Sequence, residues 1–246
     1  MRFNQHLPSI FTLINLFLGF IAIINIQQGN YLIACYVLLA AGAFDSVDGK
    51  LARMLGIPTN FGKEIDSLAD MVSFCLAPSL LVYALYTQNM PGISGEVIAS
   101  VPLIMGAIRL ARFNAIDDKP SDSFIGLPTP INALAIASLV LFMEHSKMVN
   151  PEYSQPRLLL PLIFSLSFLM VSRVQYPKFP LINLKAGKQN NYRLFGVMLF
   201  VICFGTAIVI GFPYRVLAFF VAYYILSGLV MHVINLGNIE INNQET

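Results

Sequence analysis

Long apolar runs make up most of this chain, and their length limits the folds open to it. A helix needs about 20 mostly apolar residues to cross the hydrocarbon core of a bilayer. Turn-forming segments such as QQGN, QNMPGISGE and NPEYSQP separate the runs. We expect about eight membrane-spanning helices, at residues 10–26, 31–53, 67–87, 97–114, 127–143, 158–173, 192–211 and 214–235. The sequence thus predicts an all-α polytopic membrane bundle that forms a single domain over residues 1–246.

Charged residues are scarce and unevenly distributed along the chain. Only 11% of the 246 residues are charged, whereas about a quarter of the residues of an ordinary soluble domain are charged. Loops on one side of the predicted membrane carry 12 of the 15 Lys and Arg residues, and the other side carries Lys147, Arg157 and Arg215. By the positive-inside rule the first side is cytoplasmic, so both termini lie inside the cell. The net charge of +2 therefore reflects membrane topology, and we expect no nucleic-acid partner.

The three cysteines give no sign of a metal site or a disulfide framework. Cys35, Cys75 and Cys203 lie in different apolar runs, and their spacing is not that of metal ligands. We expect all three to be small buried hydrophobic residues.

Four aspartates lie at the ends of two of the most apolar runs. Asp45 and Asp48 are three residues apart near the end of the second run, and Asp66 and Asp70 are four apart around the start of the third. Residues three or four apart share a helix face. A short turn around Pro58 would bring the two helices, and with them all four carboxylates, together. Charged groups inside a membrane are costly and by default functional.

Carboxylates gathered in a medium of low dielectric constant need a cation or must take up protons. Oxygen ligands favour Mg²⁺, Mn²⁺ or Ca²⁺, and the absence of nearby His or Cys argues against zinc. Gly49 and Ala52 leave the helix surface bare beside the acids, so that a large substrate can approach closely. Lys50, Arg53 and Lys63 supply cationic donors for a phosphate. The pattern indicates a phosphate-containing, lipidic substrate.

Two other interpretations of the acids are open. Acids at a helix N-terminus suit the helix dipole, and charges at the ends of spans often extend to the interface. That account fits Asp66, Lys50 and Lys63, but it does not fit Asp45 and Asp70, which lie deeper in apolar sequence. Buried acids can also line an ion or proton path. A transporter, however, would spread its acids through the depth of the membrane, whereas these cluster at one face.

The segment from Asp45 to Asp70 has the pattern D-x2-D-G-x2-A-R-x8-G-x3-D-x3-D. At every fixed position it resembles the signature of the CDP-alcohol phosphatidyltransferases. The segments LPSIFTLINLFLGF, RLARFN and SFIGLPTP extend the resemblance to the bacterial integral-membrane phosphatidylserine synthases, as far as about Met143. One departure is Ser9 after Pro8, where members of the family often have Asn.

The resemblance implies transfer of a phosphatidyl group from CDP-diacylglycerol to L-serine, with release of CMP, at the cytoplasmic face of the cell membrane. It implies a divalent cofactor, Mg²⁺ or Mn²⁺, with Ca²⁺ as a substitute in a crystal, and a homodimer embedded in membrane lipid. Asp70 is the expected general base. The implied metal ligands are Asp45, Asp48, Asp66 and Asp70, and the residues implied to border the cytidine diphosphate are Gly49, Ala52, Arg53 and Gly62.

Other polar residues of the first five runs have less specific signals. Thr12 and Asn15, three apart in the first run, either meet the cytidine or bond a neighbouring helix. The segment SFIGLPTP either lines the mouth of the site or only begins a helix.

The acceptor alcohol has to be recognised outside the signature. Serine carries a carboxylate, which guanidinium groups bind well, so we expect Arg109, Arg112 and Asn114 in RLARFN to bind serine. The positive-inside rule alone would also place two arginines here. The alternative acceptors are glycerol 3-phosphate and inositol phosphate, whose phosphate would call for more basic residues near the metal site.

Overall fold

The computed structural model describes residues 7–55, 60–115, 123–149, 159–177, 188–211 and 213–244, with backbone alone at residues 48–55, 235–244 and a few others. The contacts divide the chain into two compact units, one of residues 1–118 and 128–171 and one of residues 119–127 and 172–246. The prediction of a single domain stays a prediction. The first unit contains α1 (Leu7–Gln27), α2 (Tyr31–Leu55), α3 (Asn60–Asp70), α4 (Ala77–Val82), α5 (Ser94–Ala99), α6 (Val101–Ala115), α7 (Thr129–Val149) and α8 (Leu159–Val171). The second contains the strands β1 (Ser123–Ile125) and β2 (Gln175–Pro177) and the helices α9 (Lys188–Ile210) and α10 (Pro213–Gln244).

The helices lie on the predicted apolar runs and make the chain a largely helical membrane bundle, although α3 already begins at Asn60, α7 ends at Val149 and α10 ends at Gln244. Four helical segments of the described chain are long and apolar enough to cross a bilayer: Ile10–Gln27, Phe61–Thr87, Ser94–Ala115 and Pro213–Ile234. Shorter apolar helices cover Tyr31–Val47, Leu159–Val171 and Leu194–Ala207. The number of spans and the side on which the termini lie stay predictions.

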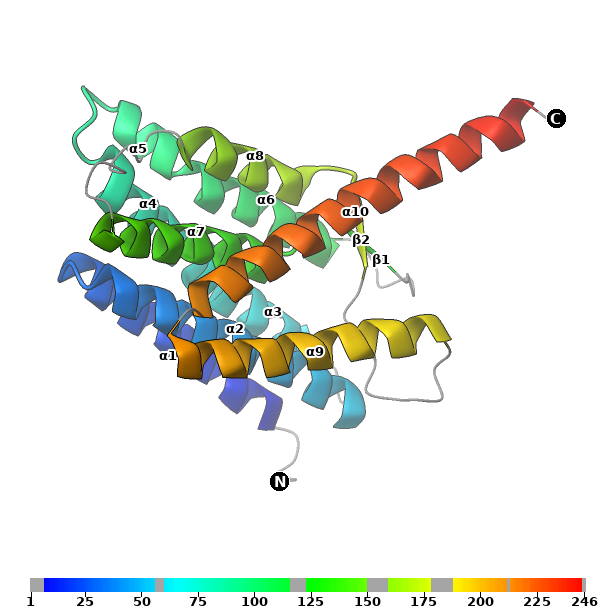
Figure 1. The fold of residues 1–246 in the computed structure, drawn as a ribbon, viewed down its shortest axis with the longest axis horizontal. Coiled ribbons are helices and arrows are strands. Elements are labelled where there is room, and N and C mark those ends of the chain that lie inside the picture. Colours follow the sequence, from blue (N-terminus) through cyan, green and yellow to red (C-terminus); the bar gives the residue numbers. More distant parts are fainter. Residues whose placement is uncertain are drawn as a thin grey trace. The chain divides into compact units, whose positions relative to one another are not determined.

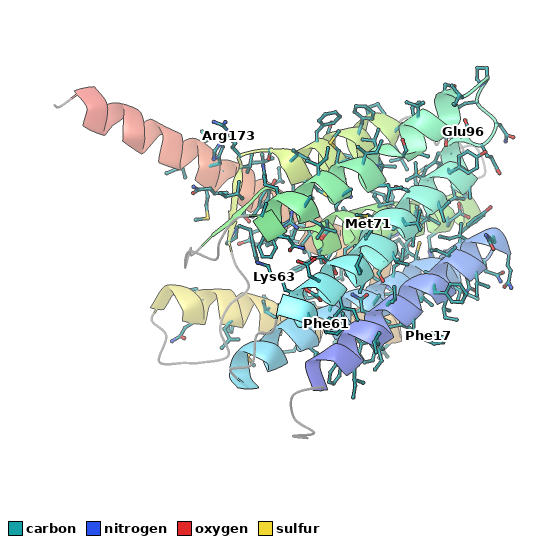
Figure 2. All side chains as sticks on the ribbon, turned by 180° about the vertical axis from the view of Figure 1, so that it is seen from behind. Phe17, Phe61, Lys63, Met71, Glu96 and Arg173 are labelled. Atoms are coloured by element: carbon teal, nitrogen blue, oxygen red, sulfur yellow. The ribbon has the colours of Figure 1, made fainter. Side chains whose placement is uncertain are left out.

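Helix α1 is apolar on its outer face and polar on its inner face. Its exposed side chains are Ile10, Leu13, Phe17 and Phe20, whereas Thr12, Asn15 and Ala22 are buried. Phe17 is 60% exposed and projects from the outer side of the helix (Figure 2). Helices that pack against one another in lipid commonly place small and polar residues at their contacts. The distribution on α1 is therefore that of a helix with lipid outside and protein inside.

The helix that starts at Asn60 continues to Thr87 through two π-helical turns. The first, η2 (Met71–Leu76), follows Asp70 directly, and the second, η3 (Tyr83–Thr87), follows α4. Pro78 lies in the first turn of α4 and has no N–H to donate. Its ring would clash with the carbonyl group four residues earlier in an α-helix, and the wider π turn avoids that clash.

The π turn η2 packs against α1, α6 and α7. Ser73 Oγ donates a hydrogen bond of 2.9 Å to the carbonyl oxygen of Asn15 in α1. A Cβ atom at Gly19 would overlap Ser73, and one at Gly106 in α6 would overlap Cys75. The π turn is thus enclosed between two helices whose glycines allow the close approach. Helix α8 packs against both α6 and α7 in the same unit (Figure 1).

The second unit contains a strand pair that the sequence analysis did not predict. Strands β1 and β2 are antiparallel, with Phe124 paired to Tyr176. Tyr176 stacks on Tyr224 of α10 with ring centroids 5.8 Å apart, and the Tyr224 hydroxyl donates to the Pro177 carbonyl oxygen at 3.0 Å. Burial raises the pKa of the Tyr176 phenol to about 12. A side chain at Gly228 would overlap the Tyr176 ring, so α10 holds β2 closely.

Two of the three cysteines are buried as predicted, and the third is not. Cys35 and Cys75 lie in the core of the first unit, but Cys203 on α9 is exposed. Helix α9 has large apolar side chains on several faces, and the described part of it packs against α10. A helix with this composition can expose a cysteine to lipid without a polar environment.

We predict that Gly19→Ala destabilises the protein. The added methyl group would overlap Ser73, and overpacking of this kind costs about 1–3 kcal/mol. The midpoint of thermal unfolding of the detergent-purified protein should therefore fall. Gly205→Ala is the control, because a Cβ atom there meets nothing within 4 Å among the described residues. Equal midpoints for the two variants would contradict the close packing of α1 on η2.

Candidate active site

Three of the four predicted aspartates converge in the first unit. Asp45 comes from α2, and Asp66 and Asp70 lie one turn apart on α3. One carboxylate oxygen from each lies within 4.8 Å of the others. Asp45 and Asp66 are half-buried, and Asp70 is 9% exposed. The side chain of Asp48 lies outside the described residues, although its backbone continues the same helix.

The three carboxylates fit a divalent metal ion. Oxygen ligands at this separation are what Mg²⁺, Mn²⁺ and Ca²⁺ prefer. Asp70 Oδ1 is buried and has no hydrogen-bond partner among the described residues. A buried carboxylate oxygen without a partner is unfavourable, and a metal ion would satisfy it. The structure therefore supports a cation site here and leaves the choice of ion open.

Asp70 is held from the side of α7. Thr129 Oγ1 donates a hydrogen bond of 3.3 Å to Asp70 Oδ2, and Thr129 is fully buried. A Cβ atom at Gly106 would lie 3.8 Å from the Thr129 methyl group, so α6 meets α7 at this point. Arg109, one turn further along α6, is 8% exposed and interacts electrostatically with Asp70. Helices α3, α6 and α7 thus each place one polar side chain in the same buried region.

The other residues predicted to bind serine form contacts between helix ends. Arg112 Nη1 donates a hydrogen bond of 3.1 Å to the carbonyl oxygen of Val171, the last residue of α8. Asn114 Nδ2 donates to Ser67 Oγ at 3.0 Å and to Glu64 Oε2 at 3.4 Å. These bonds join α6 to α8 and to α3. Arg109 therefore lies beside Asp70, whereas Arg112 and Asn114 have partners that also give them a structural role.

The positively charged Lys63 lies at the start of α3. Its ammonium group is 5.3 Å from the centroid of the Phe113 ring on α6, a cation–π contact. Figure 2 places Lys63 near the helix end that carries Phe61. This contact adds to those of Asn114 in holding α3 against α6.

The residues predicted to border the nucleotide are described only in part. Thr12 and Asn15 lie on the buried face of α1, at 3% and 0% exposure, and neither side-chain polar atom of Asn15 has a hydrogen-bond partner in the described chain. Gly62 is half-buried, one turn before Asp66 on α3. The side chains of Ala52 and Arg53, like residue Gly49, lie outside the described part of α2, whose backbone extends to Leu55.

Two buried residues of α7 were not named from the sequence as site residues, although Thr129 belongs to the SFIGLPTP segment, for which lining the mouth of the site was one of two alternatives. Thr129 bonds Asp70, and Asn132 is fully buried with both side-chain polar atoms unpartnered among the residues described. A signal for them exists, because TPIN at 129–132 repeats the Thr-x2-Asn spacing of TLIN at 12–15. Both pairs prove to be buried polar pairs within a helix.

Comparison with known proteins gives consistent matches. The family model described as CDP-alcohol phosphatidyltransferase matches residues 5–174. The CDP-diacylglycerol–serine O-phosphatidyltransferase of Helicobacter pylori strain J99 is 33% identical over 241 residues, which cover 97% of this chain and 96% of the relative. The enzyme of the same name from Bacillus subtilis is 32% identical over 190 residues, 76% of this chain and 99% of the relative. The archaetidylserine synthase of Methanothermobacter thermautotrophicus is 33% identical over 176 residues, 70% of this chain and 70% of the relative.

We predict that Mg²⁺ or Mn²⁺ stabilises the protein through these carboxylates. A ligand present at 100 times its dissociation constant adds about 2.7 kcal/mol to the free energy of unfolding. The midpoint of thermal unfolding should therefore rise with added metal, and Asp66→Asn should remove the rise. Glu64→Gln is the control, since Glu64 is exposed on the same helix outside the cluster. A metal-dependent rise that survives Asp66→Asn would show that the ion binds elsewhere.

Proposed function

Because the chain belongs to the CDP-alcohol phosphatidyltransferase family, we propose that it transfers the phosphatidyl group of CDP-diacylglycerol to the hydroxyl group of L-serine, which forms phosphatidylserine and releases CMP. The observation that carries the proposal is the cluster of Asp45, Asp66 and Asp70, which is built from the segment that has the family signature. Relatives named for transfer to serine, two of them matched over almost their whole length, support serine as the acceptor.

The enzyme is proposed to lie in the cell membrane as a multi-pass protein of about eight spans. Both termini and the carboxylate cluster would face the cytoplasm. The distribution of Lys and Arg between the two sets of loops supports this orientation. A homodimer is expected from the family resemblance alone.

The donor is proposed to bind between α1, α2 and the start of α3. Asp45, Asp48, Asp66 and Asp70 would hold Mg²⁺ or Mn²⁺, whose chemistry is to neutralise the charge that develops on the pyrophosphate when CMP leaves. The bare helix surface near the acids would admit the cytidine diphosphate. The residues proposed to line it are Gly49, Ala52, Arg53, Gly62, Thr12 and Asn15.

Asp70 is the proposed general base. The hydrogen bond from Thr129 orients the Asp70 carboxylate, which is proposed to accept the proton of the serine hydroxyl group. As the serine oxygen bonds to the phosphorus of the phosphatidyl group, the bond from that phosphorus to the CMP oxygen breaks. The displacement is in line and uses no covalent enzyme intermediate. Isolation of a phosphatidyl-enzyme would contradict it.

Arg109 is the proposed ligand of the serine carboxylate. It is buried beside Asp70, and a guanidinium group can bind a carboxylate through two parallel hydrogen bonds. Arg112 and Asn114 remain proposed members of the serine pocket. Their hydrogen bonds to Val171, Ser67 and Glu64 mean that changes there also disturb the packing of α6.

We predict that CMP release from CDP-diacylglycerol depends on serine and on a divalent metal. Purified protein in mixed micelles is incubated with labelled serine, glycerol 3-phosphate, inositol phosphate or inositol. Serine should give a labelled lipid at a rate at least about 100-fold above the others, because a binding site that lacks partners for an acceptor's polar groups rejects it strongly. Labelled lipid from glycerol 3-phosphate in place of serine would contradict the choice of acceptor and leave the family chemistry intact. Ion flux without CMP release would support a transporter.

We predict a graded effect of changes at Asp70 and Thr129. General-base catalysis contributes about 10²–10⁴-fold, so Asp70→Asn should reduce kcat by that amount. Thr129→Val keeps the side-chain shape but loses the hydrogen bond, and it should reduce kcat by about 10-fold with little change in KM for CDP-diacylglycerol. Thr129→Ser retains the hydroxyl group and should restore most of the rate. If the Val and Ser variants are equally active, the hydrogen bond does not position Asp70.

A further inference from the structure

Asn132 is a polar residue in the interior of the first unit that the proposed mechanism does not use. It is fully buried, and neither Oδ1 nor Nδ2 has a hydrogen-bond partner among the described residues. Its neighbours on α7, Ile131 and Ala133, are apolar and buried. An unsatisfied buried amide costs free energy that an apolar side chain of similar size would not. A polar residue inside a membrane protein is by default a candidate functional residue.

The position of Asn132 relates it to the carboxylate cluster. It follows Thr129 by three residues on α7, and residues at this spacing share a helix face. Thr129 bonds Asp70, and α7 packs against η2. Gly106 of α6 lies close to both Cys75 and Thr129, and the next turn of α6 carries Arg109. Asn132 and Arg109 therefore lie about one helical turn from the Thr129–Asp70 hydrogen bond, on two different helices.

The two buried asparagines belong to different helices that pack against the helix carrying Asp70. Asn15 belongs to α1, which packs against α3 and η2, and its carbonyl oxygen accepts the bond from Ser73. Asn132 belongs to α7, which meets η2 together with α6. In an in-line displacement the incoming hydroxyl group and the leaving group occupy opposite sides of the phosphorus. With the nucleotide beside α1 and the start of α3, as proposed above, the acceptor belongs where Thr129 and Arg109 meet Asp70.

Serine presents three groups to such a site: a hydroxyl, a carboxylate and an ammonium. Asp70 is assigned to the hydroxyl group and Arg109 to the carboxylate. The ammonium group then needs a hydrogen-bond acceptor, and the amide oxygen of Asn132 is an acceptor without a partner in the described structure. We propose that Asn132 Oδ1 accepts a hydrogen bond from the ammonium group of the acceptor amino acid, so that Arg109 and Asn132 together select a zwitterion. The inference rests on the proposed transfer to serine and names a specificity residue for it.

This assignment also explains why a phosphorylated alcohol would be disfavoured. Glycerol 3-phosphate has no ammonium group, so it would leave the Asn132 oxygen buried without a partner. Sites built to bond a particular polar group reject analogues that lack it by as much as about 10⁴–10⁵-fold. Asn132 would therefore act through specificity for the acceptor and not through the metal or the base.

The test compares Asn132→Leu with the wild-type enzyme. Leu has a similar size and no polar atom, so the midpoint of thermal unfolding should stay equal or rise. The apparent KM for serine should increase about 10- to 100-fold, the value of one hydrogen bond to a charged group, while KM for CDP-diacylglycerol stays within about twofold. Ser138→Ala on the same helix is the matched control, because Ser138 is buried and bonds only locally, to the Ala135 carbonyl oxygen, in the described structure.

Acceptor analogues separate the amino group from the carboxylate. 3-Hydroxypropanoate lacks the ammonium group and ethanolamine lacks the carboxylate. In Asn132→Leu the preference for serine over 3-hydroxypropanoate, measured as a ratio of kcat/KM, should fall at least about 10-fold, whereas the preference over ethanolamine should stay the same. If the Leu variant does not fold, Asn132→Asp, which keeps an acceptor oxygen of the same size, should retain the wild-type preference over 3-hydroxypropanoate.

The outcomes distinguish this inference from the proposed function. A wild-type enzyme that does not use serine refutes the proposed acceptor and the inference with it. A wild-type enzyme that uses serine, together with an Asn132→Leu variant of unchanged KM and unchanged preference, overturns the role of Asn132 alone. Loss of the serine preference in Asn132→Asp as well would show that Asn132 does not act as an acceptor of the ammonium hydrogen bond.

Discussion

The repulsion among Asp45, Asp66 and Asp70 is the constraint on which the first unit depends. Like charges within 4.8 Å oppose the approach of α2 to α3, and the low dielectric constant of a helix bundle strengthens that opposition. Other contacts must therefore hold the helices in place. Helix α1 packs along α2 and against α3, Ser73 bonds the backbone of α1, and Thr129 bonds Asp70 from α7. The small residues at these contacts, Gly19 and Gly106, let the backbones come close enough to resist the repulsion.

The need for helices to pack closely in a bilayer also accounts for where the polar residues lie. In a bilayer there is no hydrophobic difference between lipid tails and apolar side chains, so helices associate through close packing and polar contacts. In the first unit, buried threonines, serines and asparagines lie on α1, η2 and α7, and α1 turns large apolar side chains outward. The carboxylate cluster is the most polar part of this interior. The proposed acceptor pocket is a continuation of it between α6 and α7.

Sequence patterns predicted the helices and the carboxylate cluster, which depend on nearby residues. They missed the strand pair and the contacts between helices, which depend on residues far apart in the chain. The apolar runs predicted where the helices lie, although α3 begins before its run and α7 and α10 extend beyond theirs. The spacing of Asp45, Asp66 and Asp70 predicted that α2 and α3 would bring carboxylates together. The pairing of β1 with β2 joins segments about 50 residues apart, and neither three-residue strand has a periodicity that could be recognised. The SFIGLPTP segment around Thr129 was a candidate for the mouth of the site, but the bond from Thr129 to Asp70 and the burial of Asn132 depend on how α7 packs against η2. The hydrogen bonds of Arg112 and Asn114 likewise depend on how α8 and α3 pack against α6.

The π turn after Asp70 changes the rotational phase of the helix that contains it. A π turn accommodates one more residue than an α turn, and each residue of an α-helix advances the chain by about 100°. The faces that α3 and α4 turn inward are therefore offset from each other, although the two form one continuous rod from Asn60 to Val82. On one helical face Asp66 and Asp70 point toward Asp45. On the rotated face of α4, Leu81 and Val82 are buried in the core. The extra residue in Met71–Leu76 thus rotates α4 relative to α3. As a result, α3 can turn its acids toward the cluster while α4 turns a different face toward the core.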